Sequence, residues 1–265
     1  MNYERIKLNI EDNIAVLTLN HPEVLNAISP QMLDELKHAL AQVNTPATGV
    51  RCLVITGSGR GFCAGANISR SKKNTEVNQE SPARRPLDET YNPFFLQLRD
   101  LRMPLITAVN GPAAGIGMSL ALMGDIVLAA RSAYFLQAFR RIGLIPDGGS
   151  TFLLPRLIGM ARAMELSLLA ERLPAEKALA WGLINQVHDD DCLMTEALNL
   201  ARDLATGPTI VFGLIRKAFW ESPDNTYEQQ LHLESMLQGE ASQSEDYREG
   251  VEAFWQKRSP RFKGK

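Results

Sequence analysis

Two short glycine-bearing segments contain the residues whose types and spacing have the clearest chemical meaning. They are residues 61–67 (GFCAGAN) and 110–117 (NGPAAGIG). Each follows an apolar, strand-like run, at 52–56 and 105–109, and glycine after such a run permits a tight turn and a close approach of the backbone to a ligand. Two backbone N–H groups that converge from such turns form an oxyanion hole, which stabilises an enolate because the donors are fixed before the reaction begins.

A largely parallel sheet is predicted to position these turns. The first helix is expected to begin at Ser29 as N-cap and Pro30 as first helical residue. Because strand-like runs alternate with helical stretches, the fold class is α/β, and ligands are expected beyond the carboxyl ends of the strands. The runs are 14–20, 52–56, 105–109 and 125–130.

Helical patterns dominate after Pro155, and they divide the chain. We expect a catalytic core over residues 1–200 and a C-terminal helical region over 201–265. Residues 69–92 are polar and rich in proline and charge, which is typical of either a solvated loop or a mobile lid. The predicted helices are 161–170, 174–182, 193–205, 209–220, 225–238 and 245–257.

Composition narrows the class of protein. The chain has 265 residues, 45% of them hydrophobic, and a net charge of −2, which gives no reason to expect nucleic-acid binding. Its three cysteines form no CxxC pair and its four histidines no ligand spacing, so we expect neither disulfides nor a metal site. The sequence holds no long apolar stretch, so a cytoplasmic protein without membrane contact is predicted.

The two glycine segments resemble those of the crotonase (enoyl-CoA hydratase/isomerase) superfamily. The resemblance extends from residues 21–27 (HPEVLNA) to Phe262 and Lys263. It implies a spiral of ββα repeats with a C-terminal helical appendage, an acyl-CoA thioester as substrate and no separate cofactor. It also assigns the oxyanion-hole N–H groups to Ala66 and Ile116. The family usually has glycine at the second position, but isoleucine keeps the backbone donor.

The resemblance also indicates which acid does the chemistry. The two positions at which hydratases of the family have glutamates are occupied by Ser119 and Phe139, so simple hydration is disfavoured. Both residues are candidates for the substrate pocket, although a serine at the start of a buried helix is more often a local backbone partner. Asp147 stands where some isomerases of the family have a catalytic aspartate.

Segments 143–147, 153–156, 247–254 and 257–260 look most similar to the phenylacetate-pathway isomerases. Those enzymes convert 1,2-epoxyphenylacetyl-CoA to oxepin-CoA and also shift β,γ-enoyl-CoA double bonds into conjugation. An isomerase with Asp147 as acid and base is therefore the leading hypothesis. The alternatives are an aryl-CoA dehalogenase with Asp147 as nucleophile, a hydratase with other residues, a non-catalytic acyl-CoA or RNA binder, and an aspartate that merely forms a turn or caps a helix.

The superfamily resemblance also implies contacts to coenzyme A and an assembly. The C-terminal contacts often come from a neighbouring subunit, within a homotrimer or a dimer of trimers; the alternative for the tail is a solvated basic end. The residues at the matching positions are Val24, Leu25, Ala27, Ala64, Ile68, Phe262 and Lys263.

Overall fold

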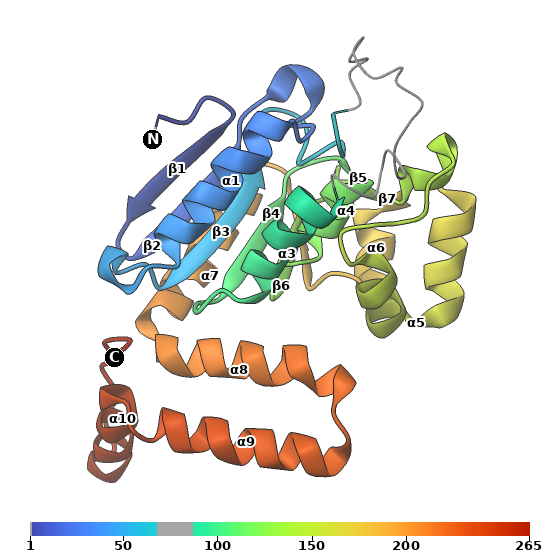
Figure 1. The fold of residues 1–265 in the computed structure, drawn as a ribbon. Coiled ribbons are helices and arrows are strands. Elements are labelled where there is room, and N and C mark those ends of the chain that lie inside the picture. The colour runs from blue at the N-terminus through green and yellow to red at the C-terminus, as the bar shows by residue number, and fades with distance from the viewer. Residues whose placement is uncertain (1, 68–86) are drawn as a thin grey trace.

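The computed structural model describes residues 2–67 and 87–265, and it has a mixed α/β fold (Figure 1). Ile68 and most of the predicted 69–92 loop lie outside the described residues. The main sheet has six strands in the order β1-β2-β3-β4-β6-β9, and a smaller sheet has the order β5-β7-β8. The strands are β1 Ile6–Glu11, β2 Ile14–Leu19, β3 Cys52–Gly57, β4 Leu105–Val109, β5 Ala113–Ala114, β6 Ile126–Ala130, β7 Tyr134–Leu136, β8 Leu173–Pro174 and β9 Gln186–His188.

The main sheet is parallel from β2 to β9, and only the β1–β2 hairpin is antiparallel. All of β4 and all but the last residue of β3 are buried, which is typical of parallel strands covered on both faces. Helix α7 (Leu193–Thr206) lies behind the sheet in Figure 1, while α1 (Pro30–Val43) and α3 (Asn92–Arg99) lie in front. The predicted α/β class with a largely parallel sheet is confirmed.

Helix α1 forms for the reasons that its sequence indicates. The Ser29 side chain accepts a hydrogen bond from the Met32 N–H at 3.2 Å, and Pro30 is the first helical residue. Apolar side chains at three- and four-residue spacing, including Leu36 and Leu40, are buried against the sheet.

The predicted helices over 174–182, 193–205, 209–220, 225–238 and 245–257 are present, with ends that differ by a few residues. Helix α5 begins earlier than expected, and it is broken at Gly159, which has φ +78° and ψ 159°; the predicted helix from residue 161 is its second half. The other helical elements of the chain include π-helix η3 Leu87–Tyr91, α4 Ile116–Ala121, 3-10 helix η4 Ala138–Ile142, α5 Ser150–Leu169, α6 Ala175–Trp181, α8 Thr209–Glu221, α9 Tyr227–Ala241 and α10 Glu245–Gln256.

Helices α8 to α10 form a separate layer beneath the sheet in Figure 1. The predicted division between residues 200 and 201 falls inside α7, which packs against the sheet as one continuous helix. The boundary between the core and the C-terminal helices lies at Gly207 and Pro208, where α7 ends and the chain leaves the sheet. Within the described ranges, no helix is both long and apolar enough to cross a bilayer.

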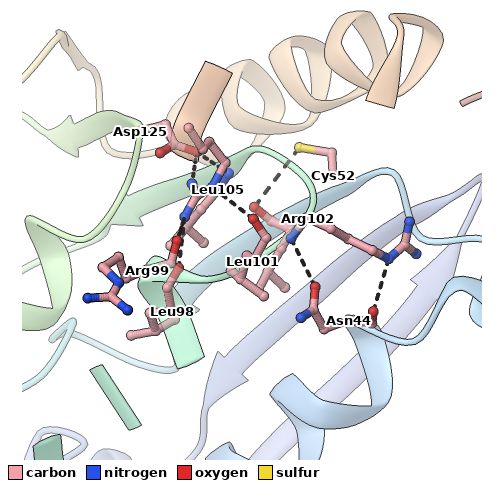
Figure 2. Close-up of polar contacts among 10 residues, drawn as sticks. Asn44, Cys52, Leu98, Arg99, Leu101, Arg102, Leu105 and Asp125 are labelled. Carbon is pink, nitrogen blue, oxygen red and sulfur yellow. Dashed lines mark hydrogen bonds and ion pairs between the residues drawn. The ribbon is translucent and has the colours of Figure 1, made fainter. Parts of the chain in front are cut away.

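One buried side chain ties this helical layer to the core. Arg216 of α8 forms an ion pair with Asp125 and donates hydrogen bonds to the Leu98 and Leu101 carbonyls at 2.7 and 3.1 Å. Asp125 also accepts a hydrogen bond from the Leu105 N–H at 2.8 Å, so these contacts hold the loop between α3 and β4 (Figure 2). The C-terminal helices are therefore attached to the core where α3 leads into β4.

Candidate active site

The two glycine segments meet at the carboxyl ends of β3 and β4, as the sequence predicts. Cys63 forms an isolated parallel bridge with Ala113, and the Ala114 N–H donates to the Cys63 carbonyl at 2.9 Å. Gly117 is required for this approach, because a Cβ there would lie 2.2 Å from the Cys63 oxygen. The backbones of the two turns are thus in direct contact.

The predicted oxyanion donors come from these turns. Among the described residues, neither the Ala66 N–H nor the Ile116 N–H donates a hydrogen bond to another group. Ile116 is the first residue of α4, where helical N–H groups have no partner within the helix. Gly115, with φ +52° and ψ −129°, turns the chain into that helix. Both N–H groups are therefore available to a ligand oxygen.

The turn at residues 21–27, for which coenzyme A contacts are predicted, packs on the first glycine segment. The Ala64 N–H donates to the Leu25 carbonyl at 2.9 Å, and the Ala27 N–H donates to the Val24 carbonyl at 3.2 Å. Asn26, which is fully buried, donates to the Gly61 carbonyl at 2.8 Å. The structure therefore brings Val24, Leu25, Ala27 and Ala64 together. Ile68 lies outside the described residues.

Asp147 lies in the loop between η4 and α5, with a half-buried side chain. Its Oδ1 atom is buried and has no hydrogen-bond partner among the described residues. Burial raises the pKa of the carboxyl to about 6. The side chain does not cap α5, since Gly149 holds the N-cap position and no side chain caps that end. An unpartnered carboxyl with a raised pKa is suited to proton transfer.

The surroundings of Asp147 place it near the oxyanion donors. Ser119, one turn after Ile116 on α4, donates from Oγ to the Asp147 carbonyl at 2.8 Å. Tyr91 packs against the main core, and burial raises its pKa to about 12, with smaller contributions from the charges of Asp147 and Cys63. Burial also raises the pKa of the Cys63 thiol to about 12, so both groups are neutral at pH 7.

The two positions at which hydratases have glutamates are buried here. Ser119 is fully buried, and its hydroxyl lies within hydrogen-bond distance of the Asp147 carbonyl, of Ser150 Oγ at 2.6 Å and of the Gly115 carbonyl at 3.5 Å. Phe139 is 7% exposed, and its ring lies closest to the position that a Cβ at Gly115 would occupy, at 3.8 Å. Phe139 therefore packs beside the second turn, whereas Ser119 lies behind Asp147.

The C-terminal residues are not part of this cluster. Arg51 donates to the Phe262 carbonyl at 3.3 Å, and the Asp246 carboxylate accepts from the Lys263 N–H at 2.6 Å. Arg51 precedes β3, so the tail lies at the opposite end of that strand from the first glycine segment, about 17 Å away along the strand. The main chain of the tail is held by hydrogen bonds, whereas the Lys263 side chain is 72% exposed. Within one chain, the tail lies apart from the glycine segments.

Sequence reasoning missed the polar residues behind Asp147. Gln137 and Ser150 are fully buried and hydrogen-bonded to each other, but neither belongs to a recognisable motif, because their contact exists only in the folded chain. Tyr91 was hidden within the polar 69–92 segment. Within the described part of the chain, no group of three or more His, Cys, Asp or Glu side chains is arranged to hold a metal ion.

Comparisons with known proteins agree with this geometry. A family model described as enoyl-CoA hydratase/isomerase matches residues 9–265. A 1,2-epoxyphenylacetyl-CoA isomerase of Escherichia coli K12 is 49% identical over 263 residues, 99% of each chain. A probable enoyl-CoA hydratase of Rhodobacter capsulatus is 44% identical over 265 residues, 100% of each chain. The crystal structure of an enoyl-CoA hydratase subunit I from Geobacillus kaustophilus HTA426 has a TM-score of 0.90 and 34% identity, covering 99% of each chain.

Proposed function

Because this chain belongs to the enoyl-CoA hydratase/isomerase family of enzymes, the crotonase superfamily, we propose that it isomerises acyl-CoA thioesters with Asp147 as acid and base. The main support for the proposal is the environment of the Asp147 carboxyl. Its carboxyl is half-buried, has a free Oδ1 and a pKa of about 6, whereas the two positions of the hydratase glutamates hold a buried serine and a buried phenylalanine. Neither of those side chains is a base for activating water.

The reaction proposed is the shift of a β,γ double bond into conjugation. The thioester oxygen accepts hydrogen bonds from the Ala66 and Ile116 N–H groups, which stabilise the negative charge of a dienolate. The ionised Asp147 carboxyl removes the proton from the α carbon and returns it to the γ carbon. The electron pair of the broken C–H bond forms the new α,β double bond, and the enzyme is regenerated. One carboxyl serves both carbons when it lies between them.

An aromatic epoxide is the second substrate proposed. The relative that is 49% identical along the full chain is named for 1,2-epoxyphenylacetyl-CoA, and the E. coli protein and this chain differ little in length. We propose that this chain acts on the same class of substrate. The same oxyanion hole would hold its thioester, and Asp147 would lie beside the ring.

A homotrimer or a dimer of trimers is the assembly proposed. Its support is the position of the tail, since Phe262 and Lys263 lie at the other end of β3 from the first glycine segment. Three large apolar side chains, Phe219 of α8 and Phe254 and Trp255 of α10, are each at least 75% exposed in a single chain. A neighbouring copy would cover them.

Product analysis tests the proposed reaction. Purified enzyme is given 3-hexenoyl-CoA, and the products are separated by chromatography and followed by ultraviolet absorbance. We expect 2-hexenoyl-CoA to accumulate, because no base is placed to add water to it. Accumulation of 3-hydroxyhexanoyl-CoA as the main product would instead support a hydratase.

A further inference from the structure

A buried chain of hydrogen bonds ends on the main chain of Asp147. The Gln137 amide Nε2 lies 3.1 Å from Ser150 Oγ, which lies 2.6 Å from Ser119 Oγ, which in turn lies 2.8 Å from the Asp147 carbonyl oxygen. All three side chains are completely buried. Buried polar groups are usually paired, and the pairing here converges on the residue proposed as acid and base; the Gln137 Oε1 atom has no partner among the described residues.

The direction of the chain follows from counting protons. A serine hydroxyl has one hydrogen, and Ser119 donates it to the Asp147 carbonyl. Ser150 must then donate to Ser119, and it accepts from the Gln137 amide. The Ser150 N–H donates to the same Asp147 carbonyl at 3.2 Å. Two donors, one from α4 and one from α5, therefore hold this carbonyl.

Packing restricts the same loop from another side. Gly148 has φ +60°, and a Cβ there would lie 2.8 Å from both Ser119 Cβ and the Phe95 ring. The loop that carries Asp147 is therefore pressed against α4 and α3. The carboxyl of Asp147 plays no part in this fixation, since its Oδ1 has no partner among the described residues.

We propose that Ser119, Ser150 and Gln137 are positioning residues, which fix Asp147 through its main-chain carbonyl and so leave its carboxyl free to take and release a proton. This inference rests on the proposed role of Asp147. A base held through its own carboxylate oxygens would have fewer lone pairs for the substrate and a lower pKa. Fixation through the backbone avoids both effects.

The test compares Ser119→Ala, Ser150→Ala and the double variant with wild type, by steady-state isomerisation of 3-hexenoyl-CoA. We expect kcat to fall about 10- to 100-fold in Ser119→Ala with KM within about twofold, because a misplaced base slows proton transfer without weakening coenzyme A binding. The double variant should be no slower than the slower single variant, as expected for one chain of hydrogen bonds. Ser167→Ala is the matched control, because Ser167 lies on the same helix as Ser150 and its hydroxyl bonds only the Ala163 carbonyl.

A second measurement keeps the inference testable whether or not the enzyme isomerises this substrate. Carbon-13 NMR of labelled aspartate, with Asp147→Asn for assignment, gives the titration midpoint of the Asp147 carboxyl. In Ser119→Ala the midpoint should move down toward 3.8 as the loop gains water, and it should not move in Ser167→Ala. An unchanged midpoint in a folded Ser119→Ala variant, or an unchanged kcat where wild type is active, would overturn the inference. An inactive wild type with a shifted midpoint would overturn only the proposed reaction.

Discussion

Asp147 combines two properties that a proton-transfer residue needs. Its pKa is about 6, so it is mostly ionised at pH 7 and yet a stronger base than an exposed aspartate. Burial is the cause, and within the described residues no cation pairs with it. Tyr91 and Cys63 nearby stay neutral because burial raises both pKa values to about 12. Of these three groups, only Asp147 titrates near neutral pH.

The raised pKa has a consequence for stability. The pKa of Asp147 is about 6 when folded, against 3.8 as its ordinary value, so between these pH values the folded state keeps a proton that the unfolded state has lost. Ionisation therefore destabilises the fold progressively up to about pH 6, and the full penalty remains above it. We expect Asp147→Asn to be more stable than wild type by about 1–2 kcal/mol at pH 8, allowing for partial solvent screening.

Urea unfolding of both proteins at pH 8 and pH 5 measures this difference. The advantage of Asp147→Asn should shrink by about half at pH 5, because part of the wild-type carboxyl penalty is then absent. An advantage that is equal at both pH values would mean that the gain has another origin. Equal stability at pH 8 would mean that the carboxyl is not strained by burial.

At the scale of elements, α8 depends on Arg216 for its attachment. The Arg216 side chain is 5% exposed, and it pairs with Asp125 and donates to carbonyls at the end of α3. Figure 2 labels Asp125 and the residues that carry these carbonyls. Arg216→Met removes the cation that pairs with the Asp125 carboxylate and the donor to the Leu98, Arg99 and Leu101 carbonyls. We expect a loss of about 3 kcal/mol in the free energy of unfolding, since breaking a buried pair from one side is strongly destabilising.

Arg131→Met is the matched control for this prediction. Arg131 pairs with two carboxylates, Glu176 and Asp189, and its side chain is 56% exposed, unlike that of Arg216. Exposed pairs contribute little, so a loss below about 1 kcal/mol is expected, measured by urea unfolding at one protein concentration. If the two variants lose the same stability, Arg216 is not the anchor of the helical layer.

The elements differ in how far sequence predicts them. Helix α1 follows from Ser29, Pro30 and an apolar repeat, all of which act within one segment. The glycine turns follow for the same reason. The break at Gly159 does not, because a glycine inside a helical pattern is compatible with an unbroken helix. The hydrogen bonds among Ser119, Ser150 and Gln137 join residues that are 13 to 31 positions apart, so no local sequence pattern predicts them.

At the scale of the whole molecule, the tail and the oxyanion turns are separated within one chain. The tail contacts Arg51 before β3, while the first turn follows Gly57 at the other end of that strand. Sequence resemblance predicts Phe262 and Lys263 as contacts to coenzyme A, and the folded chain places both residues at the other end of β3 from the first glycine segment.

Mixing two variants, each inactive or weakened, tests whether one copy completes the coenzyme A site of another. Asp147→Asn has an intact tail, and Lys263→Ala has an intact Asp147. If sites are shared between copies, subunits exchanged after mild denaturation should give an oligomer whose KM for the acyl-CoA is lower than that of Lys263→Ala alone. Light scattering should give a mass about three or six times 29.4 kDa. A monomer, or a KM that mixing leaves unchanged, would place all contacts within one chain.

The most direct test of the central claim compares wild type and Asp147→Asn in the isomerisation of 3-hexenoyl-CoA. Binding of a non-reactive acyl-CoA is measured in parallel, to show that the oxyanion turns are intact in both. The account predicts equal binding and a fall in kcat of about a hundredfold or more in Asp147→Asn, because amide nitrogen and oxygen cannot carry the proton from the α to the γ carbon. Equal kcat values in the two proteins would contradict it, since another group would then be the acid and base.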